Sequence, residues 1–202
     1  MIFKRKYLYL VLIMYIFSGC STTMPAISEY RITTDLDSSK FMQEGCRNKS
    51  LKVAQAFSSN KLMTQNMNYA QGEYKQFVFT QAQWAESPNR AVTNEILSYI
   101  SETKLFKNVQ VSKSRSSSGL VLETNIEDFM QYFTQDAKAS YANVAITLTL
   151  IDTKTNRVTA TKSFSKKVVV ESMDAQGGVV ALNSALKVVV TEGGEWLGGI
   201  CQ

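Results

Sequence analysis

Residues 141–152 have the sequence Tyr-Ala-Asn-Val-Ala-Ile-Thr-Leu-Thr-Leu-Ile-Asp, in which apolar and polar side chains alternate. Successive side chains of a β-strand point to opposite faces of the sheet. Positions 144, 146, 148 and 150 therefore place Val, Ile and Leu on one face, while Thr147 and Thr149 lie on the other. This pattern predicts an antiparallel strand with one face on a hydrophobic core and the other in solvent.

The segments on either side of this strand predict an antiparallel meander of three long strands. Residues 120–133 alternate as a long strand, and the alternation changes phase near Asp128-Phe129, which indicates a β-bulge. Residues 135–140 are expected to turn into the central strand. The sequence Asp-Thr-Lys-Thr-Asn at 152–156 predicts a hairpin connection, after which residues 157–170 run back.

Two helices are predicted, one before the meander and one after it. Ser87 is a suitable N-cap, and Pro88 fits the first helical position because no partner is needed there for its missing N–H. A largely apolar stripe with helical spacing follows at Val92, Ile96, Tyr99, Ile100 and Thr103. The second helix is expected over 179–196, with core positions at Val179, Leu182, Leu186, Val189, Val190 and Trp196. Gly193-Gly194 should loosen its last turn.

The N-terminal half has weaker patterns. Short strands are expected at 29–34, 51–57, 74–80 and 106–111, separated in part by polar loops at 35–50 and 113–119. In the second of these strands, Leu51, Val53 and Phe57 should face inward. Residues 58–73 have no clean period. The Met and Tyr residues from Met63 to Tyr74 could form an adaptable surface for lipid or protein, although an ordinary mobile loop is the simpler interpretation. The elements together predict one α+β domain with its helices on one face of an antiparallel or mixed sheet.

The N-terminus carries a targeting signal. Three cations at 4–6 precede eleven uncharged residues at 7–17, fewer than the about 20 that a membrane-spanning helix needs. The run closes with Phe17-Ser18-Gly19-Cys20, which resembles the lipobox of bacterial lipoproteins. The resemblance implies cleavage after residue 19 and acyl chains on Cys20. An uncleaved signal anchor, or an ordinary secretory signal with a chance cysteine, are the alternatives.

Three regions follow from this interpretation: a signal peptide at 1–19, a lipidated tether at 20–28 and the folded domain at 29–202. Three acyl chains hold a protein stably on a membrane, whereas a single chain holds it only marginally. The residue after the cysteine is Ser21, and not the Asp that resembles an inner-membrane retention signal. We therefore expect attachment to the outer membrane.

Composition excludes several classes of function. Removing residues 1–19 removes three of the 22 Lys and Arg and none of the 17 Asp and Glu, so the mature net charge is 19 − 17 = +2. This small charge gives no indication of nucleic-acid binding. The sequence has no His, which excludes a Ser-His-Asp triad, a Cys-His pair and His-ligated zinc. No cofactor or metal is expected.

Two cysteines remain besides Cys20, namely Cys46 and Cys201. Because an exported chain meets an oxidising compartment, we expect them to form a disulfide that ties the C-terminus to the N-terminal edge of the domain. Two free thiols are the alternative.

Several segments, taken together, resemble the PqiC-like family, the auxiliary lipoprotein component of ABC-type transport systems. They are the lipobox, Tyr-Arg-Ile at 30–32, Gln-Trp-Ala-Glu-Ser-Pro at 83–88, Leu-Phe-Lys-Asn-Val at 105–109, the hairpin with Leu-Ile-Asp at 150–152, and Ala-Leu-Asn-Ser-Ala-Leu at 181–186 followed by Glu-Trp-Leu at 195–197. The resemblance covers nearly the whole chain after residue 28. The polar loop at 35–50 and the two extra cysteines depart from the family pattern.

The resemblance implies a non-enzymatic role at the periplasmic face of the outer membrane. The expected partners are an MCE-domain protein and ABC transporter subunits that move lipids between membranes, and a homo-oligomeric ring follows by the same analogy. One competing hypothesis is an envelope assembly factor that carries lipid or lipoprotein in its own apolar cavity. A cell-envelope hydrolase is the weaker competitor, because no catalytic set is visible.

Two further sites need a structural test. Trp84 precedes a helix and could contact a partner, although packing at the helix entry is the simpler interpretation. Glu127 and Asp128 are neighbours on a strand and should point to opposite faces, which makes them a poor acid–base pair.

Overall fold

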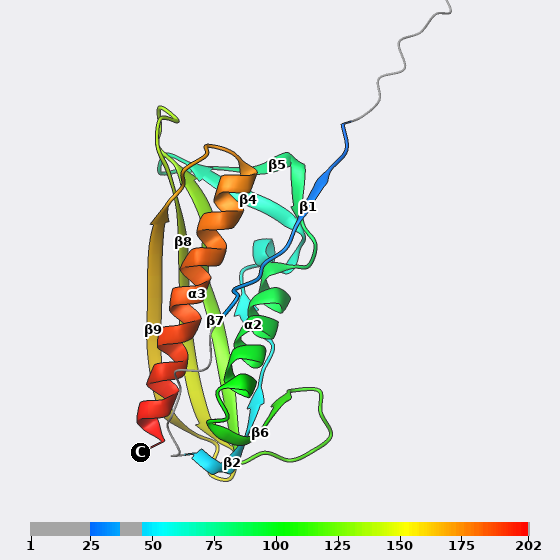
Figure 1. Ribbon diagram of the computed structural model, residues 1–202, viewed down its shortest axis with the longest axis vertical. Coiled ribbons are helices and arrows are strands. Elements are labelled where there is room, and N and C mark those ends of the chain that lie inside the picture. The colour runs from blue at the N-terminus through cyan, green and yellow to red at the C-terminus, as the bar shows by residue number, and fades with distance from the viewer. Residues whose placement is uncertain (1–24, 37–45, 202) are drawn as a thin grey trace, which may run out of the picture.

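The central strand of the sheet, β7 (Leu120–Phe133), is bonded along both of its edges (Figure 1). One edge pairs antiparallel with β8 (Ser140–Asp152) along its whole length, and β8 pairs with β9 (Arg157–Val169). Along its other edge, β7 pairs with three short strands in succession, all parallel to it: β2 (Cys46–Val53), β3 (Phe57–Ser58) and β4 (Asn66–Gln71). The computed structural model describes residues 25–36 and 46–201.

Further strands extend the two ends of this second edge. At one end, β2 pairs parallel with β6 (Phe106–Val111). At the other, β4 pairs antiparallel with β5 (Lys75–Trp84), which pairs parallel with β1 (Ser28–Tyr30). A short 3₁₀ helix, η1 (Asn60–Met63), links β3 to β4. Over the described residues the sheet is mixed and nine-stranded, so the α+β prediction is confirmed.

The predicted meander and its bulge are confirmed. The register between β7 and β8 shifts between Ile126 and Asp128, where the sequence changes phase. In β8 the apolar positions from Ala142 to Leu150 are buried, and the intervening positions are only half-buried. The alternation therefore identified correctly which face of this sheet carries the core.

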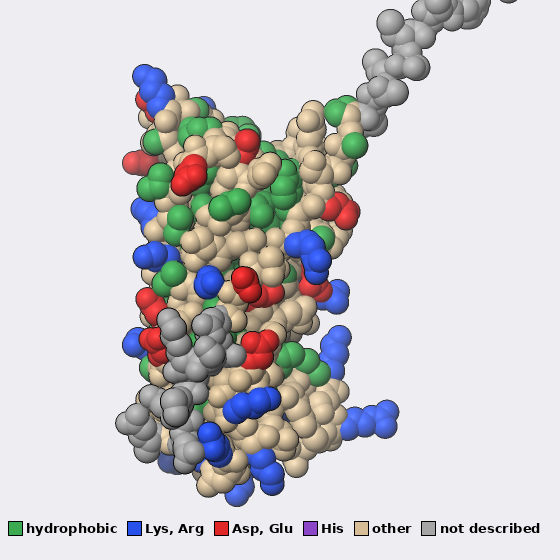
Figure 2. All heavy atoms as spheres, viewed as in Figure 1, with side chains coloured by type: hydrophobic (Ala, Val, Ile, Leu, Met, Phe, Trp, Pro, Cys, Tyr) green, Lys and Arg blue, Asp and Glu red, His purple; other side chains and the backbone are tan. Residues whose placement is uncertain are grey.

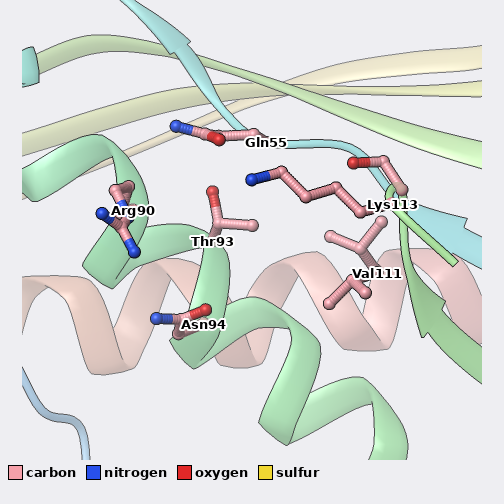
Figure 3. A pocket seen from close by; sticks show the side chains of 8 residues that line it. Gln55, Arg90, Thr93, Asn94, Val111 and Lys113 are labelled. Carbon is pink, nitrogen blue, oxygen red and sulfur yellow. The ribbon is translucent and has the colours of Figure 1, made fainter.

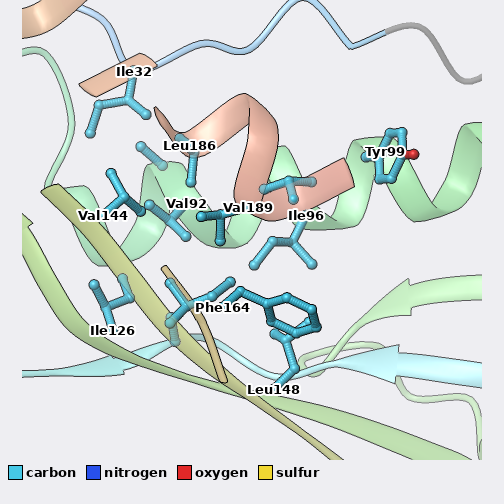
Figure 4. Packing of buried hydrophobic residues seen from close by; sticks show 14 of the residues in the cluster. Ile32, Val92, Ile96, Tyr99, Ile126, Val144, Leu148, Phe164, Leu186 and Val189 are labelled. Carbon is cyan, nitrogen blue, oxygen red and sulfur yellow. The ribbon is translucent and has the colours of Figure 1, made fainter. Parts of the chain in front are cut away.

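Both helices cover the same face of the sheet. α3 (Ala175–Ile200) lies on β8 and β9, and α2 (Pro88–Glu102) lies on β6 and β7 beside it. Figure 4 shows side chains of both helices packed over the strands, with Val92 and Ile96 from α2, Leu186 and Val189 from α3, and Leu148 from β8. All five are buried.

The prediction of a loosened end for the second helix is wrong. α3 begins four residues earlier than expected and runs through both Gly193 and Gly194 to Ile200. A Cβ on Gly193 would lie 2.8 Å from the Leu148 side chain, and one on Gly194 would lie 2.5 Å from the Tyr99 ring. The glycines therefore allow β8 and α2 to approach α3 closely, and packing outweighs their low helix propensity.

Several predictions for the N-terminal half need correction. β1 is shorter than expected, β2 begins at Cys46 inside the predicted loop, and residues 58–73 contain η1 and β4. Phe57 was expected to face inward, yet it is 56% exposed. The reason is that the strand breaks at residues 54–56, and Phe57 begins a separate strand that pairs with Asn125. The inward–outward alternation of side chains that holds for Leu51 and Val53 therefore does not continue to Phe57.

Asp174 caps the N-terminus of α3, since its carboxylate accepts a hydrogen bond from the Gly177 N–H at 2.8 Å. This bond and a second one from the Ser172 hydroxyl lower the pKa of the carboxyl. The ionised cap therefore stabilises the fold at neutral pH, and its contribution is lost as pH falls through the lowered folded-state pKa.

Asp174→Ala is expected to lower the free energy of unfolding by about 1 kcal/mol at neutral pH. The difference from wild type should shrink in acid, which urea unfolding at several pH values would measure. Asp174→Asn is the matched control, because Asn also caps helices but does not titrate. A loss in Asp174→Ala that does not shrink in acid, or no loss at all, would contradict this role for the carboxylate.

Candidate functional site

The described residues contain no recognisable catalytic or metal centre. No cluster of three or more His, Cys, Asp or Glu side chains is placed to hold a metal ion within 25–36 and 46–201. In the same residues, no helix combines the length and the apolarity needed to cross a membrane. The candidate functional sites of the described chain are therefore surfaces.

Of the residues singled out from the sequence, Cys20 lies outside the described part of the chain. Cys46 and Cys201 form a disulfide in the structure, with their Cα atoms 5.2 Å apart. The bond joins the first residue of β2 to the residue that follows α3. The C-terminal end of α3 is thereby tied to the start of β2 at one end of the sheet.

Trp84 is buried, with 3% of its surface exposed, and its ring packs edge-on against Phe129 at 5.8 Å. The backbone N–H of Trp84 donates to the Gln65 carbonyl at 2.8 Å. The side chain therefore fixes the passage from β5 to α2. Its burial does not support the alternative in which Trp84 contacts a partner.

Glu127 and Asp128 point to the same face of the sheet, which corrects the prediction of opposite faces. The bulge leaves Glu127 without a pairing residue on β8. Asp128 accepts hydrogen bonds from Tyr132 Oη at 2.8 Å and Asn143 Nδ2 at 2.7 Å, and Glu127 accepts one from the Thr147 hydroxyl. All these groups lie on the face that the helices leave uncovered.

Burial raises the pKa of the Asp128 carboxyl, although its hydrogen bonds act in the opposite direction. Burial also raises the pKa of Tyr132, and the hydrogen bond to Asp128 adds to that effect. The same face continues across β8 and β9 with hydroxyl groups, such as Thr147 and Ser163 at 2.6 Å. The network satisfies its own polar groups and does not present an activated nucleophile.

An aromatic cluster lies on the helix-bearing face, beyond the part that the helices cover. Tyr69 from β4 is at its centre, with ring centroids 5.3 Å from Phe77, 4.5 Å from Phe79 and 5.4 Å from Phe133. Phe77 is 40% exposed, and Tyr74 in the adjoining β4–β5 turn is 91% exposed. Hydrophobic side chains gather at this end of the molecule, between α3 and β1 (Figure 2). This aromatic cluster is a candidate contact surface.

The cluster lies at the end of the molecule where the chain enters β1 (Figure 1). We call this end, which also carries the turn at 134–139 and the start of α3, the tether end. Sequence reasoning missed the cluster because residues 66–71 lack a clean period. Phe77 and Phe79, two positions apart in a strand, were the available signal, since such residues share a face.

The recesses found among the described residues are shallow and open to solvent. One of about 160 Å³ lies between the start of α2 and the end of β6, where Gln55, Arg90, Thr93 and Lys113 face one another (Figure 3). Another, of about 410 Å³, lies between the end of β9 and the start of α3 and includes Val169 and Val180. Neither holds a set of groups arranged for catalysis.

Comparison with known proteins identifies a family and a shared fold. Residues 33–192 match the model of the family described as ABC-type transport auxiliary lipoprotein component. A solved structure from Xanthomonas campestris, assigned to the family DUF330, superposes with a TM-score of 0.77 at 17% identity, covering 86% of this chain and 96% of that one. A structure titled only as an uncharacterized protein gives a TM-score of 0.65 at 13% identity, covering 85% and 99%. These likenesses show a shared fold, and a search of curated proteins found no significant match.

Proposed function

The chain belongs to the family of ABC-type transport auxiliary lipoprotein components, and on this premise we propose that it serves an MCE/ABC lipid transport system from the periplasmic face of the outer membrane. In this proposal it acts by binding other subunits and not by catalysis. Its partners are an MCE-domain protein and ABC transporter subunits, and copies of the chain assemble into a ring. The family match over 33–192 is the observation that carries the proposal.

Attachment to the membrane is the first part of the proposal. Residues 1–19 serve as signal peptide, Cys20 carries the acyl chains, and residues 20–28 form the tether. Four residues lie between Cys20 and Pro25, so five Cα-to-Cα steps of about 3.6 Å each reach at most about 18 Å. The tether end of the domain is thereby held close to the bilayer.

Action by binding is the second part. The chain has no His, and the described carboxylates at 127 and 128 are engaged with neighbouring side chains. By contrast, Phe77 of the aromatic cluster and Tyr74 in the adjoining β4–β5 turn are exposed. Aromatic side chains of this kind are enriched where proteins meet partners.

The experiment compares wild type with Cys20→Ser, both with a C-terminal tag, in cells that are briefly crosslinked. Wild type is expected to fractionate with membranes and to bring down MCE-domain and ABC transporter subunits. Cys20→Ser should remain an unprocessed precursor without acyl chains. Normal processing and lipidation of Cys20→Ser would contradict the assignment of the lipobox, and absence of transporter subunits from the wild-type sample would contradict the partners.

A lipid-carrying assembly factor is the second candidate. It requires an apolar cavity, yet the space between helices and sheet is filled by buried side chains such as Leu148, Leu186 and Val189. The recess beside Val169 and Val180, which are both exposed, is a described place where a lipid chain could contact apolar walls. Lipid extracted in stoichiometric amount from the purified protein, with no transporter subunits present, would favour this candidate.

A further inference from the structure

Charge is strongly segregated along the described chain. Three segments, 46–53, 103–119 and 152–157, together hold nine Lys or Arg and a single acidic residue, Asp152. The rest of the described chain holds nine Lys or Arg against fourteen Asp or Glu. The small net charge is therefore the sum of a basic part and an acidic part of the described chain.

The three segments meet at one end of the sheet, because they contain β2, β6, the loop before β7 and the β8–β9 turn. We call this end the basic end. It comprises Arg47, Lys49, Lys52, Lys104, Lys107, Lys113, Arg115, Lys154 and Arg157. Figure 2 shows Lys and Arg side chains projecting from this end of the molecule.

Two described contacts at the basic end engage a lysine side chain and the carboxylate of Asp152 with groups other than each other. The ion pairs Arg90–Glu86 and Lys138–Asp136 lie outside the three segments. Lys52 Nζ donates to a neutral acceptor, the Ser114 carbonyl, at 3.0 Å. The Asp152 carboxylate accepts from the N–H groups of Lys154 and Thr155 in its own turn, both at 2.9 Å. An excess of positive charge gathered at one end of a molecule attracts an acidic surface.

The basic end lies opposite the tether end. α3 runs between them, and its 26 residues span about 39 Å at about 1.5 Å per residue. The short tether holds the other end near the bilayer, so the basic end is presented away from the membrane to which the chain is attached. A protein in the periplasm can reach it there more easily than the headgroups of the anchoring membrane.

We propose that the basic end is the docking surface for an acidic protein segment of the transport system. This inference rests on the proposed function and specifies the surface that it uses. Lys113 extends across the recess shared with Arg90, Thr93 and Gln55 (Figure 3). The recess has no carboxylate among its lining residues, and an acidic side chain of the partner enters it beside Lys113.

The test uses the mature lipidated protein, purified in a non-ionic detergent, and fluorescent poly-L-glutamate as the probe. Lys113→Glu/Arg115→Glu is compared with Lys75→Glu/Lys166→Glu, which changes the net charge equally but lies toward the tether end. Wild type and the control should bind the probe in low salt, and the basic-end variant should bind about tenfold more weakly or worse. Binding should fall at about 0.15 M salt, where the Debye length is about 8 Å.

Two results would overturn the inference. Equal weakening in both variants would show an effect of net charge alone. Binding that depends on Lys113 and Arg115 with vesicles containing phosphatidylglycerol, but not with poly-L-glutamate, would assign the surface to lipid headgroups.

Tagged pull-downs from cells separate this inference from the proposed function. The basic-end variant should lose the transporter subunits that wild type and control retain. If all three proteins retain the subunits, the docking surface is wrong and the proposed function stands. If wild type brings down none, the proposed function fails, whatever the result with the probe.

Discussion

Cys201→Ser is expected to lower the free energy of unfolding by about 3–5 kcal/mol, the largest effect of any single substitution considered for this protein. The disulfide joins residues 155 positions apart, and crosslinks that close long loops restrict the unfolded chain most. Cys46 is also almost fully buried, so Cys201→Ser leaves a buried thiol without its covalent partner at the start of β2. Thermal or guanidinium unfolding of oxidised protein measures the difference.

The double variant Cys46→Ser/Cys201→Ser is the control for the crosslink. If the bond supplies the stability, removing the second cysteine should cost nothing further, because the interaction is already lost in each single variant. The double variant should therefore be at least as stable as the weaker single variant. Reduced wild type should approach the same value. Two reactive thiols in denatured, unreduced wild type would contradict the crosslink.

Gly194→Ala is expected to destabilise the protein by about 1–3 kcal/mol. This is the opposite of the effect of helix propensity, which favours alanine over glycine by about 1 kcal/mol within a helix. The added methyl group would lie 2.5 Å from Tyr99 Cε1. Tyr99 is almost fully buried, with 2% of its surface exposed. The ring cannot move away without displacing α2, so relief of the clash requires the two helices to separate.

Gly199→Ala in the same helix is the matched control. Nothing lies within 4 Å of a Cβ at that position, so the substitution should stabilise the protein by about 0.5–1 kcal/mol through helix propensity alone. The two substitutions are therefore expected to have opposite signs in urea unfolding. A stabilising Gly194→Ala would show that α2 and α3 are not in close contact there.

The parts of the fold that sequence predicts well are those whose pattern is local. Residues 141–152 pair with neighbours joined by short turns, and α2 has its cap position, its proline and its apolar stripe within one segment. The strands β2, β3 and β4 instead pair with β7, far away in sequence. Their partner determines where each begins, which is why Phe57 and residues 66–71 were misassigned.

The candidate surfaces were harder to predict for a related reason. Burial of Trp84 and the shared face of Glu127 and Asp128 depend on the register between strands, and the aromatic cluster needs β4, β5 and β7 side by side. The net charge of the chain does not reveal the basic end, because its cations come from three separate segments and acidic residues elsewhere offset them in the sum. Composition gives the sum of the charges, whereas topology determines where they gather.

The position of β7 also constrains the order in which the domain can form. The meander and α3 are contiguous in sequence and can pair as they emerge, since short loops close at small entropic cost. The earlier strands β2, β3 and β4 find their bonding edge only when residues 120–133 are present. A chain exported from its N-terminus thus delivers these strands before their partner. The edge that these strands use therefore stays unformed until most of the described domain has been made.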